Sequence, residues 1–305
     1  MTSPDPAPAF HPGEQQLQQR LGVRDKMAAI GQRVIRDYMP EQHRTFFSQL
    51  RLLLIGTLDG EGQPWALLFT GPDGFITSPD SSTLCLTSTA IAGPHPGGIV
   101  LETGAPIGLL GLDFATRRRN RANGQILSRH DDHVEIRVTE SFGNCPKYIQ
   151  SRQGEPGSAH LLPGEQHHAC TLDDRDQQWI AEADTFFIAS SFPPGNRSGR
   201  AGVDISHRGG KPGFVEVIDN RHLRFPDYAG NHFFNTLGNL TLHPRAGLLF
   251  IDFDHGDLLY LAVDAAVIWN KDSQSHSIEL TVRQRIRVAA ALPWQWQPPD
   301  YSPFL

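Results

Sequence analysis

The sequence has few cysteines, no excess of basic residues and no long apolar run. Its three cysteines, Cys85, Cys145 and Cys170, are an odd number without metal-ligand spacing, which fits a reducing compartment and offers no cysteine-based metal site. Twenty-seven Lys and Arg residues stand against 33 Asp and Glu residues, a formal net charge of −6, which argues against a general nucleic-acid partner. No apolar run approaches the roughly 18 residues that a membrane helix needs.

The first segment, residues 1–10, is rich in Pro and Ala but has neither the basic start nor the apolar centre of a signal peptide. We expect this segment to be a frayed tail. Together with the lack of a membrane helix, this predicts a cytoplasmic protein with no membrane partner.

What the sequence does contain is a near repeat of itself. Residues 74–84 share Gly-Phe, Asp and Leu with residues 213–223 at a constant offset of 139, the difference between 213 and 74. Residues 108–114 (GLLGLDF) align with residues 247–253 (GLLFIDF) at the same offset. This period is too long for a solenoid or propeller unit. We therefore expect two copies of one domain, each closed around its own core.

The N-terminal part, 1–50, combines the tail with predicted helices over 13–50, and the pattern of apolar and turn residues changes after it. In 51–150, and again in 175–305, short apolar segments alternate with Gly, Pro and Asp turns, which indicates an antiparallel barrel in each part. We expect 151–174, rich in Gly, Pro, His and Gln, to be the linker. The predicted strands are 52–58, 65–70, 74–77, 83–86, 107–114 and 134–138 in the first copy, then 186–190, 203–206, 214–218, 223–225, 246–253, 258–263 and 278–288; a short helix over 175–183 and an aromatic-proline tail at 293–299 flank the second set.

The second copy contains a polar stretch that the first copy lacks. Around one strand end and a Gly-rich turn it places Ser206, His207, Arg208 and Lys211, and such basic groups beside glycines suit a phosphate. At the offset of 139, Arg208 corresponds to a phenylalanine and Lys211 to a proline. One copy is thus equipped for an anion and the other is not, and a solvated basic turn remains the alternative.

A second polar stretch, 225–240, follows a strand and is expected to open a helix. Asn231 is placed to cap that helix, whose first N–H groups favour a phosphate. With Asn235, Thr236 and Asn239 it offers uncharged donors and acceptors that suit a polar heteroaromatic ring or a ribityl chain. The alternative is a helix cap followed by ordinary turn residues.

Four runs together resemble the pyridoxamine 5′-phosphate oxidase-related FMN-binding split-barrel family, in its long tandem branch. They are 142–149, 204–214, 230–239 and 243–252, and the resemblance extends over about 11–288. It implies a mainly β fold with flanking helices (α+β), in which two tandem FMN-binding split β-barrels pack as an intramolecular pseudo-dimer. It also implies FMN as the cofactor, held at one intact site on the second barrel, the first barrel's site being degenerate.

Carried over residue by residue, the resemblance places Ser206 and Arg208 on the FMN phosphate, with Asn231 and His232 from the turn and helix. The family often has Arg or Lys where this chain has His232, so we expect either a weaker affinity for the phosphate or compensation by Lys211. Lys147, just after the first barrel, would reach the site and offer a positive charge to flavin N1 or to a substrate. The substrate-phosphate pattern of true pyridoxamine phosphate oxidases is absent from the end of the chain, so that substrate is not assigned.

Other clusters are interpreted more plainly. Cys145 has no CxxC partner, and an inert cysteine is commoner than a redox thiol. The basic run 117–121 is interpreted as a solvated hairpin tip, the alternative being contact with an anionic substrate or flavin tail. The run 130–133 has two histidines and two aspartates, and His167-His168 lies in the linker. Neither has the spacing of a zinc or non-haem iron site, so no metal site is predicted.

Three functions stay open at this point. The first is an FMN-dependent oxidoreductase or flavin reductase acting on a small molecule, with NAD(P)H as a candidate donor and catalytic residues unknown. The second is a non-catalytic flavin- or haem-binding protein for storage or sensing. The third is a structural module in which the copies merely pack together. The sequence does not settle the substrate, or whether the pseudo-dimer pairs again as a homodimer.

Overall fold

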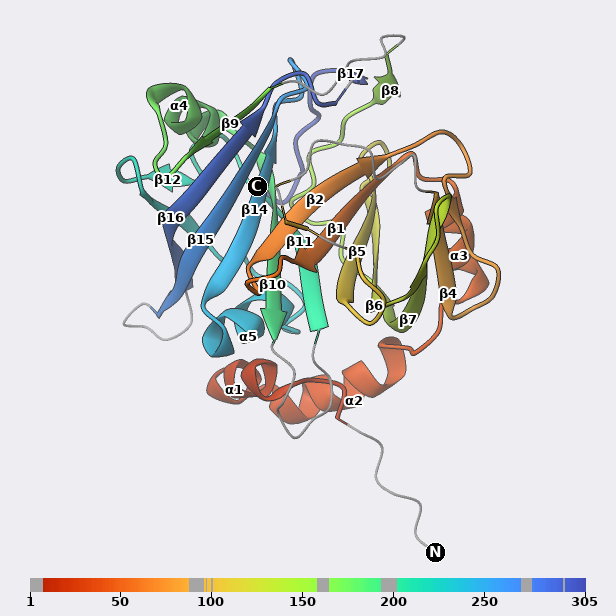
Figure 1. The fold of residues 1–305 in the computed structure, drawn as a ribbon. Coiled ribbons are helices and arrows are strands. Elements are labelled where there is room, and N and C mark those ends of the chain that lie inside the picture. Colours follow the sequence, from red (N-terminus) through yellow and green to blue (C-terminus); the bar gives the residue numbers. More distant parts are fainter. Residues whose placement is uncertain are drawn as a thin grey trace, which may run out of the picture.

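The computed structural model describes residues 8–87, 96, 98–99, 101–157, 165–192, 202–269, 276–292 and 294–305. The fold is mainly β, with antiparallel sheets and a few helices (Figure 1). No helix in these ranges is long and apolar enough to cross a membrane. The predicted run Pro293 to Pro299 falls partly outside the described residues, because residue 293 is not among them.

The first sheet has seven antiparallel strands in the order β2-β1-β5-β6-β7-β4-β3. Most of them agree with the predicted segments, because apolar stretches between turn residues dominate this part of the chain. The strand β6 was not predicted, and it is the one that contains most of the basic run 117–121. The bounds are β1 (Leu52–Leu58), β2 (Pro64–Thr70), β3 (Ile76–Thr77), β4 (Thr83–Thr87), β5 (Pro106–Asp113), β6 (Arg118–Arg129) and β7 (His133–Gly143).

The second sheet repeats that order with its own strands, as β11-β10-β14-β15-β16-β13-β12. The segment 151–174, expected to be a linker, contributes two short strands, of which β9 pairs with β16 and β8 pairs with β17. The bounds are β8 (Gly154–Pro156), β9 (Gln166–Ala169), β10 (Thr185–Phe192), β11 (Gly202–Gly209), β12 (Glu216–Val217), β13 (His222–Pro226), β14 (Arg245–Ile251), β15 (Leu258–Trp269), β16 (His276–Val288) and β17 (Trp294–Trp296).

The two sheets meet through reciprocal close contacts. A Cβ added to Gly108 on β5 would lie 2.4 Å from the carbonyl oxygen of Val203 on β11. A Cβ added to Gly247 on β14 would lie 2.2 Å from the carbonyl oxygen of Pro64 on β2. These two contacts are related by the offset of 139, since Gly108 corresponds to Gly247 and Pro64 to Val203. The junction therefore has the reciprocity of an isologous interface, in which patch i contacts patch j and patch j contacts patch i.

The hydrophobic core is not divided evenly between the copies. One buried cluster lies wholly in the second part of the chain, around Phe186, Phe225 and Phe250. The larger cluster combines first-copy residues such as Phe69 with second-copy residues such as Tyr260. The expectation of a separate closed core for each copy is therefore wrong for the first copy, because its apolar surface is completed by the second.

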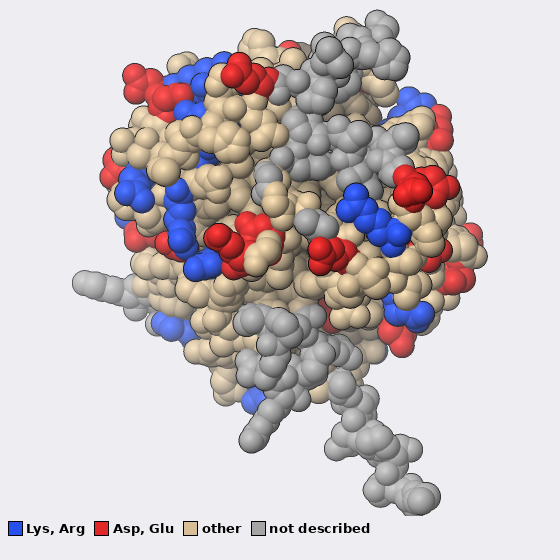
Figure 2. Space-filling model, viewed as in Figure 1, with Lys and Arg blue, Asp and Glu red and all other residues tan. Residues whose placement is uncertain are grey.

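Helices cover the ends of the sheets. The predicted helical region 13–50 forms α1 (Pro12–Arg20), α2 (Arg24–Val34) and α3 (Glu41–Ser48), and the predicted 175–183 helix is α4 (Asp174–Glu182). The N-terminal α1 packs on α5 (Asn235–Leu242) (Figure 1), where a Cβ on Gly13 would come within 2.2 Å of Gly238 O. On the face in Figure 2, acidic and basic side chains are interspersed and form no large patch of one sign.

Candidate functional site

A cavity of about 130 Å³ lies where β6, β11 and the start of α5 come together. Residues from both sheets line it, so neither copy forms the site alone. Buried residues on β6, β11 and α5 make its inner part, and exposed residues of the loops after β7 and β13 make its rim. Eight of the ten predicted binding residues line it: Lys147, Ser206, His207, Arg208, Asn231, His232, Asn235 and Thr236.

Arg121 on β6 connects the two sheets beneath the cavity. Its Nη1 donates to Asp204 Oδ1 at 2.7 Å, and its Nη2 donates to Ile205 O at 2.8 Å and to the hydroxyl of Ser206. The Ser206 hydroxyl also accepts from Thr236 Oγ1 at 3.0 Å. Arg121 thereby fixes the position of β11 relative to β6 and holds the Ser206 side chain at the cavity.

Arg208 is the cavity cation of β11. Its Nη1 donates to the carbonyl of His207 at 3.2 Å, and its Nη2 lies 3.7 Å from Asp227 Oδ1. Asp227 is shared, because its Oδ2 also pairs with His276 Nε2 at 2.9 Å. Burial lowers the pKa of Arg208 from its ordinary value, with the attraction of Asp227 opposing this and the charge of Arg121 adding to it. The Arg208 side chain is 22% exposed, so its charge is largely shielded from water and is incompletely neutralised by the ion pair at 3.7 Å.

Arg119, also on β6, adds a further positive charge. Its Nε donates to Cys145 O at 2.8 Å, and its Nη1 lies 3.5 Å from His207 Nδ1. Burial, and then repulsion from Arg208 and Arg121, lower the pKa of Arg119 to about 10. Burial and the neighbouring arginines also lower the pKa of His207 well below its usual value. His207 is therefore neutral at pH 7, and because a guanidinium only donates, its Nδ1 accepts and its Nε2 carries the proton.

The charges and donors of the cavity are unbalanced. Its described lining residues include four cations, Arg119, Arg121, Lys147 and Arg208, against the single carboxylate Asp227, while Asp204 behind the lining pairs with Arg121. Four buried side-chain nitrogens of lining residues have no hydrogen-bond partner in the described structure, and each is a donor: Arg121 Nε, Asn144 Nδ2, His207 Nε2 and Arg208 Nε. Buried donors are rarely left unpaired. The site is thus suited to a ligand that is anionic and rich in acceptors.

The loop between β13 and α5 differs from its prediction. Asn231 does not cap the helix, because α5 begins at Asn235; instead Asn231 Oδ1 accepts from Phe233 N at 3.1 Å. His232 and Phe234 have φ of 61° and 63°, a left-handed conformation that interrupts any earlier helical start. No side chain caps α5, so its first N–H groups remain available beside the cavity. Strained residues of this kind cluster at functional sites.

Two predicted residues are not brought to the cavity. Lys211 is exposed in the turn after β11 and does not line it. Asn239 is buried, and its Nδ2 donates to Asp204 Oδ2 at 2.9 Å and to Ser190 Oγ at 3.1 Å. Asn235 lines the cavity while its Nδ2 donates to Glu14 Oε1 at 2.6 Å, which connects α1 to the site.

The rim of the cavity contains aromatic side chains and one thiol. The rings of Tyr148 and Tyr228 lie 5.1 Å apart, and Tyr148 Oη donates to Ala229 O at 3.0 Å, which connects the rim of one copy to that of the other. The Lys147 ammonium lies 5.3 Å from the ring centre of Phe304. Cys145 is exposed and lines the cavity.

The interpretation of 117–121 as a solvated hairpin tip is wrong for its later members. Arg117 lies in the turn and pairs with Asp300, and Arg118 donates to the carbonyl of Gln42. Arg119 and Arg121 lie on β6 and line the cavity. Alternate residues of a strand share a face, so the Arg-x-Arg spacing was the sequence signal for this pair.

The positions related to the cavity residues Arg121 and Arg208 by the offset of 139 hold aromatic residues instead. The register of β5 with β6 pairs Leu110 with Arg121, and that of β14 with β15 pairs Leu249 with Tyr260, so Tyr260 stands where Arg121 does. Phe69 stands where Arg208 does, at the offset of 139. Phe69 and Tyr260 are both at most 1% exposed and belong to one apolar cluster. Side chains therefore fill the place that the cavity has in the other half.

No protein-family model and no curated protein matches the chain. Among solved structures it is similar to HupZ of Group A Streptococcus (15% identity, 34% of this chain and 94% of that chain, TM-score 0.27). It is also similar to a "putative pyridoxamine 5′-phosphate oxidase" of Corynebacterium glutamicum (10% identity, 43% and 98%, TM-score 0.27). A third likeness is to a K. pneumonia MrkH–c-di-GMP complex (11% identity, 76% and 78%, TM-score 0.22). At these TM-scores, function has to be inferred from the cavity itself.

Proposed function

We propose that the cavity binds FMN and that the protein is an FMN-dependent oxidoreductase or flavin reductase acting on a small molecule. The observation that carries this proposal is the set of four unpaired buried donors among lining residues with four cations and one carboxylate. A phosphate ester supplies the negative charge and the acceptor oxygens that such a set lacks. The proposal includes two tandem split barrels, 51–150 and 175–305, paired within the chain.

The lining residues fall into two groups, one beside the start of α5 and one on the rim. Arg208, Ser206 and Thr236 meet beside the uncapped start of α5, and this is where we place the phosphate. Asn231 and His232 on the rim are left for the ribityl chain or ring edge. All four unpaired nitrogens require an acceptor, and the cavity of about 130 Å³ would hold only part of the cofactor, with the rest over the rim.

FMN, when bound, would supply hydride or electron transfer between a donor such as NAD(P)H and a substrate. The chain's own contribution is orientation and charge. Arg121 holds β11 in place through Asp204, Lys147 keeps a cation at the rim, and neutral His207 adds no further positive charge beside Arg119. Arg121, Ser206 and His207 are each at most 6% exposed, and this burial strengthens their electrostatic interactions.

One site per chain is part of the proposal. In the other half, Phe69 and Tyr260 take the places of Arg208 and Arg121 and pack into the core. Binding of a phosphate there would require burying its charge among apolar side chains, which is strongly unfavourable. We therefore expect a stoichiometry of one FMN per chain.

A non-catalytic cofactor-binding protein is the second candidate, with flavin or haem. Two histidines, His207 and His232, line the cavity, so a haem spectrum of the purified protein would favour this candidate. For flavin, the two candidates differ only in turnover.

The test begins with the absorption spectrum of the purified protein and with FMN added to saturation, followed by anaerobic NADH or NADPH. One FMN per chain that is reduced by the nucleotide and reoxidised in air supports the oxidoreductase. FMN that binds but is not reduced by either nucleotide supports the binding protein. A protein that takes up no FMN at concentrations up to about 100 μM, an order-of-magnitude ceiling for a functional site, overturns the oxidoreductase and the flavin-binding protein.

A further inference from the structure

A second cluster of chemically active side chains lies at the far end of β6 from the cavity. The β6–β7 hairpin turns over residues 130–133, where His130 N donates to His133 O at 2.8 Å. The register pairs Ser128 with Glu135, and alternate residues of a strand share a face. The hairpin therefore brings His130, His133 and Glu135 to one side of the sheet, although their consecutive numbering gave no metal-ligand spacing.

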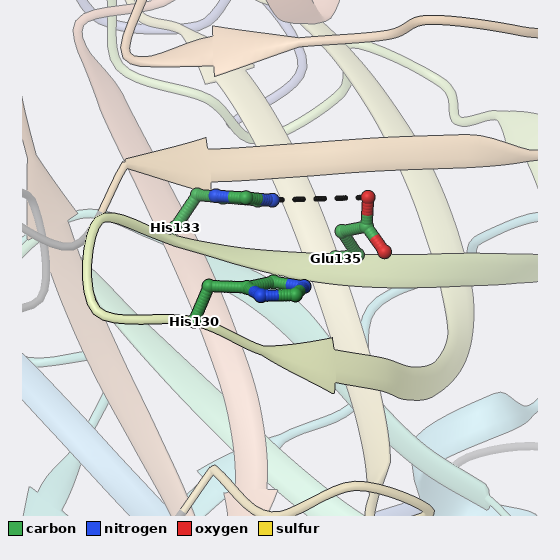
Figure 3. Close-up of side chains that lie close together, drawn as sticks. All are labelled: His130, His133 and Glu135. Carbon is green, nitrogen blue, oxygen red and sulfur yellow. Dashed lines mark ion pairs between the residues drawn. The ribbon is translucent and has the colours of Figure 1, made fainter.

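The donor atoms of these three residues converge (Figure 3). One ligand atom from each lies within 4.8 Å of the others. His133 Nε2 is 3.7 Å from Glu135 Oε1, and the two imidazole rings stack with centroids 4.5 Å apart. Ser128 Oγ contacts both His130 Nε2, at 2.9 Å, and Glu135 Oε2, at 2.6 Å. The candidate ligand atoms of the two imidazoles and the carboxylate thus lie close together.

An outer carboxylate orients one of the rings. Asp132 Oδ1 lies 2.7 Å from His133 Nδ1, so Nδ1 donates to it and Nε2, which lies 3.7 Å from Glu135 Oε1, is the nitrogen left to bind an ion. A histidine held in this way by a carboxylate is the usual arrangement around a bound zinc ion. Exposed His–Asp pairs of this kind also occur at His222–Asp219 and His255–Asp252, but among the described residues only the hairpin gathers three candidate ligands.

We propose that His130, His133 and Glu135 bind a divalent transition metal, with Zn²⁺ as the best match. Two imidazoles and one carboxylate suit zinc, and a water molecule would complete a tetrahedron. Bonds of about 2.0–2.1 Å place tetrahedral ligand atoms about 3.3–3.5 Å apart. The His133–Glu135 distance is already close to this, and the remaining closure requires only side-chain rotation on an exposed hairpin.

This site is independent of the proposed flavin site. From residue 119 to residue 129, β6 extends about 30 Å, so a metal at the hairpin does not contact a ligand in the cavity. The bound ion would join the two strands of the hairpin outside its backbone hydrogen bonds. Failure of one proposal leaves the other unaffected.

The experiment is calorimetric titration of ZnCl₂ into untagged, metal-free full-length protein. We expect one Zn²⁺ per chain, a loss of affinity of at least about 100-fold in His133→Ala and in Glu135→Gln, and about 10-fold in Asp132→Asn. The matched control is the double variant His167→Ala/His168→Ala, which removes the other exposed histidine pair and should bind zinc as the parent does.

Circular dichroism of each metal-free variant checks that the fold is retained; if His133→Ala unfolds, His130→Ala and Glu135→Gln carry the test. X-ray absorption of the zinc-loaded protein should show nitrogen and oxygen ligands only. Unchanged affinity in folded hairpin variants, loss of binding in the His167/His168 control, or no zinc binding by the parent protein would each overturn the proposal.

Discussion

Replacing Arg208 with Phe should remove the phosphate contact while leaving the fold in place. The substitution copies the first half, where Phe69 occupies the corresponding position. Arg208 is 22% exposed and makes one long ion pair, at 3.7 Å, with Asp227. After the substitution Asp227 keeps its other partner, His276, at 2.9 Å. Little native bonding is therefore lost. A charge-assisted hydrogen bond contributes roughly 1.5–3 kcal/mol, so FMN affinity should fall about 10- to 150-fold.

The assay is the quenching of flavin fluorescence on titration, performed with FMN and with riboflavin, which lacks the phosphate. Arg208→Phe should weaken FMN binding and leave riboflavin binding within about twofold of the parent. Lys211→Ala is the matched control, because it removes a cation of the adjacent turn that does not line the cavity. Equal losses for FMN and riboflavin, or a Lys211 effect as large as that of Arg208, would refute the assignment of Arg208 to the phosphate.

Four further substitutions test the surrounding fold. Phe69→Ala should cost about 3–5 kcal/mol of unfolding free energy in urea, because Phe69 is 1% exposed, and a cost below about 1 kcal/mol would contradict its core role. Gly108→Ala and Gly247→Ala should each lower the unfolding free energy by about 1–3 kcal/mol, because the new Cβ would lie 2.4 and 2.2 Å from a carbonyl oxygen. Gly60→Ala is the control, since it has open space around it. If Gly108→Ala is tolerated, the two sheets do not form this tight junction. Burial raises the pKa of Glu14 well above its usual value, and the charges of Asp204 and Glu140 add to this effect. The folded state therefore retains the proton of Glu14. As pH rises above about 4.5, the unfolding free energy of the parent should fall relative to that of Glu14→Gln, by up to about 1.4 kcal/mol per pH unit. Parallel pH–stability curves for the two proteins would show that Glu14 ionises normally.

The secondary structure could be predicted where local signals decide it. Alternating short apolar segments and turn residues gave most strands, and the repeat anticipated that two segments of the chain would fold alike. The strand β6 was missed because Arg119 and Arg121 resemble a solvated tip when only charge is considered. Their burial depends on the second copy, whose Asp204 compensates Arg121, and that pairing is not visible in local sequence.

Most of the predicted binding residues line the cavity, and the two that do not lie three residues beyond ones that do. Ser206 and Arg208 lie two apart on one strand, so locating one located the other. Asn239 failed for a geometric reason: Thr236 on α5 contacts Ser206, and one helical turn later Asn239 contacts Asp204, two residues back along β11. The helix thus moves away from the cavity as it proceeds. Lys211 failed because the turn after β11 directs it to solvent.

Because the cavity residues come from both sheets, bound FMN should stabilise the association of the two sheets. At 100 times the dissociation constant, a ligand of the native state adds about 2.7 kcal/mol to the unfolding free energy. At the same FMN concentration, Arg208→Phe, binding about 10- to 150-fold more weakly, should gain only about 0.3–1.4 kcal/mol. Hydrogen exchange should locate the effect, with FMN slowing exchange on β6 of the first sheet as well as on β11 and α5. Protection confined to the second sheet would mean that Arg119 and Arg121 support the fold without contributing to the binding of the ligand.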